Sequence, residues 1–308
     1  MIKDITGLHH VTSFASDPVA NNRFFTQTMG LRRVKKTVNF DRPKVYHLYY
    51  GDEAGSAGTV MTYFPIPGFK ARERGTGEVG VTRFSVPKGS LGYWKDRFSG
   101  ENVIQIQAEA RFGDIVHGFE GPDGDQFELV EAEEDQRAPW MSDVAEDYAV
   151  RGFHSAAMRL QSGDAMVELL KFMGYETADK SGKTVRMIRP DGNEANIIDV
   201  ETHSGVGAST EGAGAVHHIA FSVPDEEAQL RVREALVDTG YKVTPVIDRD
   251  YFKAIYFRTP GGVLFEVATD GPGFPRDEPL DALGENLKLP RQHEHLREEL
   301  NKILVPIN

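Results

Sequence analysis

Four segments of the chain open with a similar alternation of apolar and polar residues. These openings read "LHHVTSFASD", "VGVTRFSVPK", "FHSAAMRLQS" and "VHHIAFSVPD". Such alternation is typical of a strand with one buried face. A helix-like segment follows each opening, and the first of them lies between the capping residue Asp17 and the terminating residue Gly30. The recurrence indicates one structural unit used four times.

Each helix-like segment is followed by alternating stretches and by a turn that leads into a last strand. These endings read "GSAGTVMTYF", "GPDGDQFELV", "RPDGNEANIIDV" and "TPGGVLFEVA". A unit of strand, helix and three strands is too small to bury both faces of its own sheet, so units must pair. The pattern therefore predicts an α+β fold. Four βαβββ modules form two paired, cup-shaped incomplete β-barrels with the helices outside.

The length of 308 residues accommodates two ordinary domains. We predict an N-terminal half at 1–140, with modules at about 7–65 and 78–132. The predicted C-terminal half spans 150–272, with modules at about 152–201 and 215–269. A helical tail is predicted at 280–308.

Composition narrows the function classes without changing this architecture. The formal charge of −12 disfavours nucleic acid and anionic membranes as partners. The chain has no cysteine, which excludes disulfides, thiolate metal sites and thiol nucleophiles. No apolar run approaches the roughly 18 residues of a membrane span, and the first ten residues show no signal-peptide pattern. We therefore expect a soluble cytoplasmic protein.

Two of the four openings contain a His-His pair, and strand alternation distinguishes the members of each pair. His218 shares a face with the small residues Ala220 and Ser222, whereas His217 shares the opposite face with apolar residues. The same register directs His10 into the cup and His9 away from it. This pattern makes His10 and His218 candidate cavity residues.

The last strand of the fourth module adds a carboxylate. Glu266 is flanked by Phe265 and Val267, and a buried carboxylate is costly unless it is paired or bound to a metal. The equivalent inward positions of the four modules are His10, Thr62, Val81, Glu128, Ser155, Asp199, His218 and Glu266.

Only the first and fourth modules together supply two imidazoles and a carboxylate. That ligand set, with open positions, is the facial triad of non-haem Fe(II) oxygenases. A single buried histidine is more often a hydrogen-bonded core residue, but two equivalent histidines and a core glutamate favour a metal site. We predict that His10, His218 and Glu266 hold Fe(II), with Mn(II) or another divalent metal left open.

Four further residues are candidates for catalysis. Tyr256 lies opposite Glu266 if a three-residue loop joins the last hairpin, although a core tyrosine with a satisfied hydroxyl is an equal interpretation. Arg249 begins this hairpin and could meet an anionic group, or else remain a solvated loop residue. His9 and His217 face away from the ligands by alternation, yet they could orient the ligands or reach the site edge as acid–base groups.

The βαβββ unit and the "PDGDQFELV" ending resemble the vicinal oxygen chelate superfamily, which includes glyoxalases, extradiol dioxygenases and antibiotic-resistance proteins. Within it, "LHHVT", "HHIAFSVPD", "RTPGGVLFE" and "LGENLKLP" most resemble ring-cleaving dioxygenases that act on hydroquinones. The resemblance implies a non-haem Fe(II)-dependent, extradiol-type dioxygenase that consumes O2 and a small aromatic diol. The metal ligands it implies fall on His10, His218 and Glu266, and its active-site tyrosine and arginine fall on Tyr256 and Arg249.

Other functions on the same fold stay open. A glyoxalase-like lyase or isomerase would require a fourth protein ligand, and Thr62 cannot replace a glutamate or histidine at that corner. A non-catalytic resistance protein that sequesters an aromatic compound would need no metal. The sequence is compatible with a homo-oligomer and does not define the ring substituents.

Overall fold

The computed structural model describes residues 1–307, and the four modules follow one another along the chain. The first module contains β1 (Gly7–Ala15), α1 (Pro18–Arg23), the π-helical η1 (Phe24–Thr28), β2 (Arg32–Val38), β3 (Tyr46–Gly51) and β4 (Val60–Pro65). The second contains β5 (Glu78–Val86), α2 (Leu91–Gly100), β6 (Gln105–Ile106), β7 (Val116–Glu120) and β8 (Gln126–Glu131).

The second half of the chain repeats this order. The third module contains β9 (Gly152–Leu160), α3 (Asp164–Phe172), β10 (Glu176–Ser181), β11 (Thr184–Ile188) and β12 (Ile197–Thr202). The fourth contains β13 (Val216–Val223), α4 (Glu226–Asp238), β14 (Ile247–Asp248), β15 (Phe252–Arg258) and β16 (Leu264–Pro272). The tail consists of the short 3₁₀ helices η2 (Phe274–Arg276), η3 (Leu280–Ala282) and η4 (Arg291–Leu296), followed by α5 (Arg297–Ile303).

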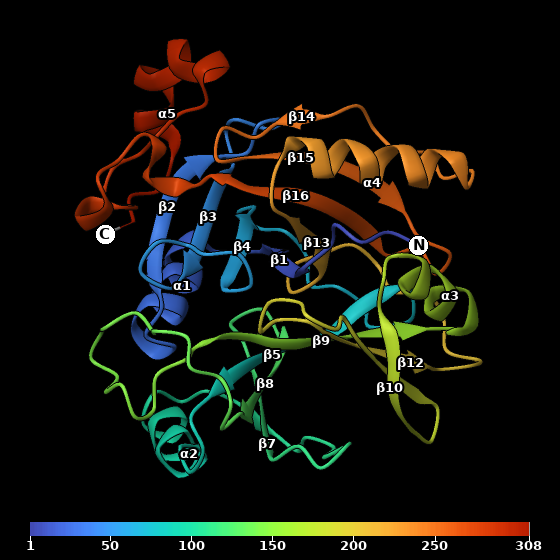
Figure 1. Ribbon diagram of the computed structural model, residues 1–308. Coiled ribbons are helices and arrows are strands. Elements are labelled where there is room, and N and C mark those ends of the chain that lie inside the picture. The colour runs from blue at the N-terminus through green and yellow to red at the C-terminus, as the bar shows by residue number, and fades with distance from the viewer. Residues whose placement is uncertain (308) are drawn as a thin grey trace.

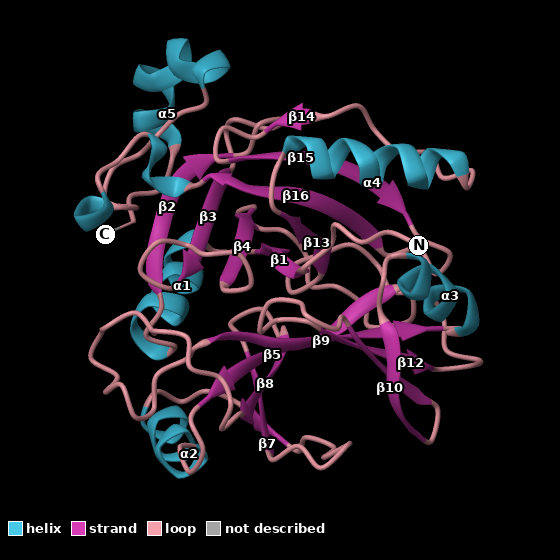
Figure 2. Ribbon diagram, viewed as in Figure 1, coloured by secondary structure: helices cyan, strands magenta, loops and turns pink. Residues whose placement is uncertain are grey.

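The strands form two curled eight-stranded sheets, and each sheet joins one module from each half of the chain. The first sheet has the order β14-β15-β16-β13-β1-β4-β3-β2, so the first and last modules meet along β1 and β13. The second sheet has the order β10-β11-β12-β9-β5-β8-β7-β6, in which the inner modules meet along β5 and β9. Figure 1 shows the blue and orange ends of the chain combined in the upper sheet, and Figure 2 shows the helices on the outside. The predicted fold class is confirmed.

Local chemistry explains where the helices begin. The Asp17 carboxylate accepts hydrogen bonds from the backbone N–H groups of Val19 and Ala20, and the Asp225 carboxylate caps α4 by accepting one from the N–H of Ala228. The buried face of α4 includes Ala228, Val232 and Leu236. Helical spacing alone would also allow Leu230 on this buried face, but the residue is 53% exposed.

The second cup holds a buried ion-pair cluster where the first cup holds its histidines. Arg83 pairs with both Glu128 and Asp199. Arg186 Nε lies 2.8 Å from Asp199 Oδ1 and Arg186 Nη2 lies 2.7 Å from Asp114 Oδ2. Each of these acids therefore has an arginine partner, which is the condition for burying charge without a metal.

Replacement of Asp199 by alanine is expected to destabilise the protein by about 3–5 kcal/mol, because two buried guanidinium groups lose a shared partner. Urea unfolding of purified protein measures this change. The exposed pair of Glu168 and Lys171 supplies the control, since Glu168→Ala should change stability by no more than about 0.5 kcal/mol. Equal effects of the two substitutions would contradict the assignment.

The tail is anchored on the first module. Lys35 is fully buried, and its Nζ lies 2.6 Å from both Asp277 Oδ1 and Glu278 Oε2. The Nε2 of His293 lies 2.7 Å from the carbonyl oxygen of Phe40, in the loop between β2 and β3. The tail thus supports a loop that borders the site described below.

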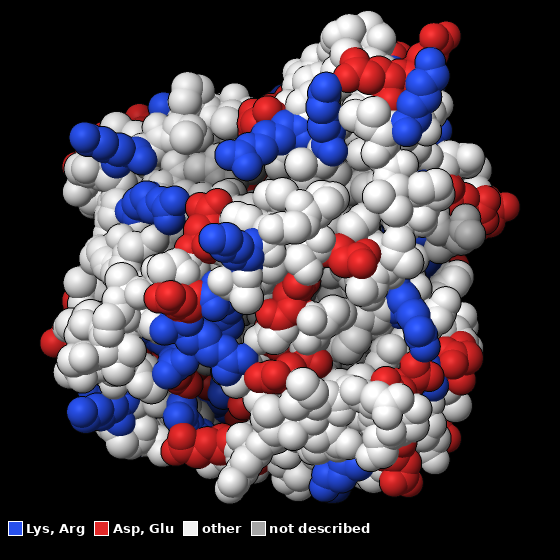
Figure 3. Space-filling model, turned by 180° about the vertical axis from the view of Figure 1, so that it is seen from behind, with Lys and Arg blue, Asp and Glu red and all other residues white. Residues whose placement is uncertain are grey.

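The surface charges are mixed. Figure 3 shows basic and acidic side chains interspersed over one face of the molecule, unlike the one-signed basic surface of a nucleic-acid-binding protein. Among residues 1–307, no helix combines the length and the apolar character that crossing a membrane requires.

Candidate functional site

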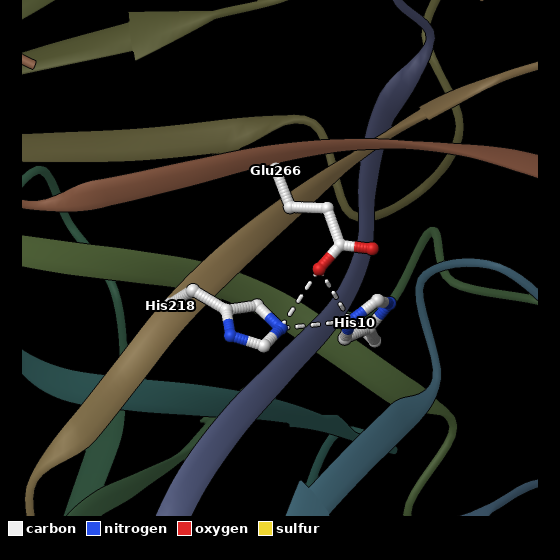
Figure 4. A group of neighbouring side chains, drawn as sticks. All are labelled: His10, His218 and Glu266. Carbon is white, nitrogen blue, oxygen red and sulfur yellow. Dashed lines mark hydrogen bonds and ion pairs between the residues drawn. The ribbon is translucent and has the colours of Figure 1, made fainter. Parts of the chain in front are cut away.

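Three neighbouring strands of the first sheet bring His10, His218 and Glu266 together. Their ligand atoms all lie within 4.8 Å of one another, and all three side chains are buried. The Nε2 atoms of the two histidines are 3.2 Å apart, and Glu266 Oε2 lies 2.9 Å from that of His218 and 3.5 Å from that of His10 (Figure 4). The structure therefore places three candidate ligands, from opposite ends of the chain, around one point.

The chemistry of this group fits a divalent metal. Neither carboxylate oxygen of Glu266 has a hydrogen bond of good geometry among the described residues, although the carboxylate is fully buried. Burial by itself raises the pKa of Glu266, but His10 and His218 hold it well below its usual value. Burial lowers the pKa of His218 despite the nearby carboxylate. An ionised carboxylate and a neutral imidazole are the forms in which these side chains bind metals.

His9 and His217 do not face away from the ligands, so the expectation from strand alternation is wrong for both. Each lies at a register shift between β1 and β13, where one extra residue bulges out of the ladder. A bulge re-aims a side chain, which breaks the alternation. As a result, Nδ1 of His9 lies 2.9 Å from Nδ1 of His10, and Nδ1 of His217 lies 2.7 Å from Nδ1 of His218.

The pKa values of these two neighbouring histidines predict loss of stability in acid. Burial, followed by the adjacent imidazole, lowers the pKa of His9 and of His217 to about 3. Between about pH 3 and pH 6.5 the unfolded chain therefore binds more protons, so the free energy of unfolding falls as the pH falls. We expect His9 and His217 together to account for a loss of about 2–3 kcal/mol in the metal-free protein between pH 7 and pH 5.5, measured by denaturant unfolding.

A double variant, His9→Asn with His217→Asn, provides the control for this pH effect. It should remove the part of the pH dependence that these two residues contribute, because asparagine does not titrate, whereas the buried His47 and His154, whose pKa values are also lowered, keep their part. An unchanged pH dependence in that variant would assign the effect to other groups.

Tyr256 pairs in register with Glu266, as the hairpin geometry predicted. Its ring centroid lies 5.8 Å from that of His218, and its hydroxyl accepts a 3.2 Å hydrogen bond from Arg249 Nε. Burial and then Glu266 raise the pKa of Tyr256 well above 10, while Arg249 opposes this. The Arg249 guanidinium lies 5.4 Å from the ring centroids of both Phe40 and Tyr256. Arg249 is thus held at the site and is not a solvated loop residue.

The sequence analysis missed a hydrogen-bonded chain on the opposite wall. His47 Nε2 lies 2.7 Å from the hydroxyl of Thr62, and His47 Nδ1 lies 2.8 Å from the hydroxyl of Tyr49. The Thr62 hydroxyl also lies 3.0 Å from that of Thr12. The alternation in "YHLYYG" places His47 and Tyr49 on one face of β3, and this signal could have identified the pair.

A cavity of about 290 Å³ opens from the three candidate ligands towards the surface. We call it the metal cavity. Its walls are largely aromatic, and its mouth is formed by the loop between β2 and β3. The lining includes Phe14, Asn39, Phe40, Asp41, Arg42, His47, Tyr49, Phe64, His217, Arg249, Phe252 and Tyr256. An apolar pocket with a few convergent polar groups is typical of a small-molecule site.

Comparisons with known proteins identify similar chains. The chain is 42% identical to the provisionally named ring-cleaving dioxygenase MhqO of Bacillus subtilis, covering 99% of this chain and 98% of the relative. It is 35% identical to the chlorohydroquinone/hydroquinone 1,2-dioxygenase of Sphingobium indicum, covering 96% and 95% respectively. The predicted resemblance to ring-cleaving dioxygenases is confirmed.

Solved structures lead to the same family. The crystal structure of a provisionally named dioxygenase from Bacillus subtilis matches with a TM-score of 0.95, 42% identity and coverage of 99% of this chain and 98% of that one. Glyoxalase I from Zea mays shares the fold, with a TM-score of 0.64, 13% identity and coverage of 86% and 92%. A model of the Glyoxalase/Bleomycin resistance protein/Dioxygenase superfamily matches residues 7–267, and the chain belongs to this superfamily.

Proposed function

We propose that this protein is a ring-cleaving dioxygenase that uses Fe(II) and O2 to open a hydroquinone-type ring. The observation that carries the proposal is the three-ligand group of His10, His218 and Glu266, which no fourth histidine or carboxylate among residues 1–307 joins. Thr62 occupies the position at which a four-ligand site would have its fourth side chain, and its hydroxyl is already hydrogen-bonded to Thr12 and His47. Three ligands leave coordination positions for a substrate oxygen and for O2, which favours an oxygenase over a four-ligand lyase.

The named activities of two relatives support the same proposal, since one is named for hydroquinone and chlorohydroquinone. When bound, Fe(II) supplies a Lewis-acidic and redox-active centre beside a ring hydroxyl. We infer Fe(II) from the ligand types, with Mn(II) as the alternative metal. We also infer extradiol-type cleavage, next to the hydroxylated ring carbon.

The chain's own groups have separate tasks in this proposal. Tyr256 donates its hydroxyl proton in a hydrogen bond to an oxygen of the substrate, and Arg249 stabilises negative charge that develops on the phenol. Phe252 packs its ring 5.3 Å from that of His9 and 5.1 Å from that of His10, which shields the ligand imidazole of His10 and its partner His9 from water. His9 and His217 hold the ligand imidazoles through their Nδ1 atoms.

The substitution His9→Ala is expected to weaken metal binding by about 10–100-fold, because the His10 ring loses the partner that orients it. Competition with a metal-sensitive dye measures this affinity. His154 precedes Ser155 at the equivalent place in the second sheet, so His154→Ala is the matched control and should leave metal affinity unchanged. Equal losses in both variants would indicate a general structural effect.

The function itself is tested by anaerobic purification, metal analysis and substrate addition under air. We expect about one iron per chain, and O2 uptake that matches hydroquinone consumption one to one. Diol turnover without O2 uptake would indicate a lyase or isomerase. Tight diol binding by a metal-free protein would indicate sequestration. Cytoplasmic location and assembly into homo-oligomers stay predictions, as does the division into two halves.

A further inference from the structure

A second cavity of about 610 Å³ lies beside the metal cavity. The two cavities share three lining residues, which are Phe14, Glu211 and His217. Beyond these three, the second cavity is lined by residues that the proposed chemistry does not use. It lies where the segments before the second and fourth modules run side by side, joined by the bridges Ala71–Ala213 and Thr76–Ala208.

Phe14 forms the aromatic part of the wall between the cavities. It is 6% exposed, and its ring centroid lies 5.1 Å from that of His217 at an interplanar angle of 76°. Phe69 supports the same ring from behind, with a centroid distance of 5.4 Å. The packed rings of Phe14 and His217, together with Glu211, therefore separate the space next to the metal ligands from the larger second cavity.

The second cavity has the lining of a subsite for an uncharged group. Next to the partition stand Ala215 and Val216, and several small residues line the rest, among them Gly77, Ala208, Ser209, Gly261 and Gly262. The carboxylate of Glu78 is neutralised by an ion pair with Arg72. The remaining charged side chains, Glu211 and Arg258, have opposite signs and give no net charge.

We propose that Phe14 determines substrate size in this protein. Its ring restricts substrates to hydroquinones with small substituents, and the second cavity accepts a bulky uncharged substituent when that ring is removed. The inference rests on the proposed function, because it takes a hydroquinone as the molecule in the metal cavity. In a closely packed wall, removal of one ring creates space that a substituent can fill.

Phe64 offers a matched control. Phe14 and Phe64 are register partners on the adjacent parallel strands β1 and β4, and their ring centroids lie 6.0 Å apart. Both line the metal cavity, but only Phe14 also lines the second cavity. Phe14→Ala and Phe64→Ala thus remove the same group from the same cavity, and only the former joins it to the second.

The experiment compares hydroquinone with phenylhydroquinone in two measurements. Anaerobic calorimetry of the metal-loaded protein gives the dissociation constants, and O2 uptake gives kcat/KM. Phe14→Ala should raise the preference for phenylhydroquinone over hydroquinone by about 10-fold or more, whereas Phe64→Ala should change it by no more than about twofold. No change in Phe14→Ala, or equal changes in both variants, would overturn the proposal.

Two further variants guard against misfolding and a nonspecific gain. Phe14→Leu removes less volume and should produce a smaller change of the same sign. Adding Ala215→Leu to Phe14→Ala fills the second cavity just behind the partition and should cancel the gain. A gain that survives this filling would place the substituent elsewhere and overturn the assignment of the subsite.

Binding and turnover separate the two levels of the proposal. If the diols bind with the expected ratios but no O2 is consumed, the proposed dioxygenase function fails and the subsite stands. If the protein turns over hydroquinone and Phe14→Ala does not alter the preference, only the subsite fails. With 2,5-dihydroxybenzoate, Phe14→Ala should give no gain, and a gain equal to that for phenylhydroquinone would refute the uncharged class.

Discussion

The substitution His218→Ala is expected to abolish metal binding and turnover together while the protein keeps its fold. His218 supplies one of three candidate ligands, and its Nε2 lies within 3.2 Å of both His10 Nε2 and Glu266 Oε2. Two remaining ligands hold a divalent ion poorly, so we expect turnover to fall by at least about 100-fold. Elemental analysis and O2 uptake measure the two losses.

The fold is expected to survive because a large core surrounds this one cavity residue. The metal-free variant should be about 1–3 kcal/mol less stable than the metal-free parent, since buried Glu266 loses a partner. His203 directly follows β12 of the second sheet and pairs with Glu201, so His203→Ala should leave metal content and turnover unchanged. Full metal occupancy in His218→Ala would refute the proposed ligand set.

The second large effect is expected from Tyr256→Phe, which should keep the metal and lose most of the rate. Only the hydroxyl is removed, so the ring still packs beside His218 and the strand pairing with Glu266 persists. If that hydroxyl assists proton transfer, kcat should fall by about 10²–10⁴-fold. KM should change far less, because the metal and the aromatic walls still bind the substrate.

Tyr251 provides the comparison for this prediction. It packs in the same small hydrophobic cluster as Tyr256, but its hydroxyl donates to Asp277, away from the metal ligands. Tyr251→Phe should therefore leave kcat nearly unchanged. A normal kcat in Tyr256→Phe would support the other interpretation of Tyr256, as a core tyrosine whose hydroxyl is merely satisfied by Arg249.

Much of the fold and of the ligand group is visible in the sequence, because strands have a strict two-residue period. That period assigns His10, His218 and Glu266 to inward faces, and repetition of the module makes their positions equivalent. The hairpin "RTPGGVLFE" also sets the pairing of Tyr256 with Glu266, because a three-residue loop determines the register. These inferences are local, so they need only the order of residues along the chain.

The tertiary structure decided everything that depends on packing between modules. Register shifts turn His9 and His217 towards the ligands, and such shifts arise where β1 and β13 pair, 208 residues apart. Within the first module, the engagement of Thr62 by His47 depends on the pairing of β3 with β4. Local periodicity determined which faces are buried, whereas contacts between distant strands determined which groups meet, because no local pattern encodes the fit of one sheet edge on another.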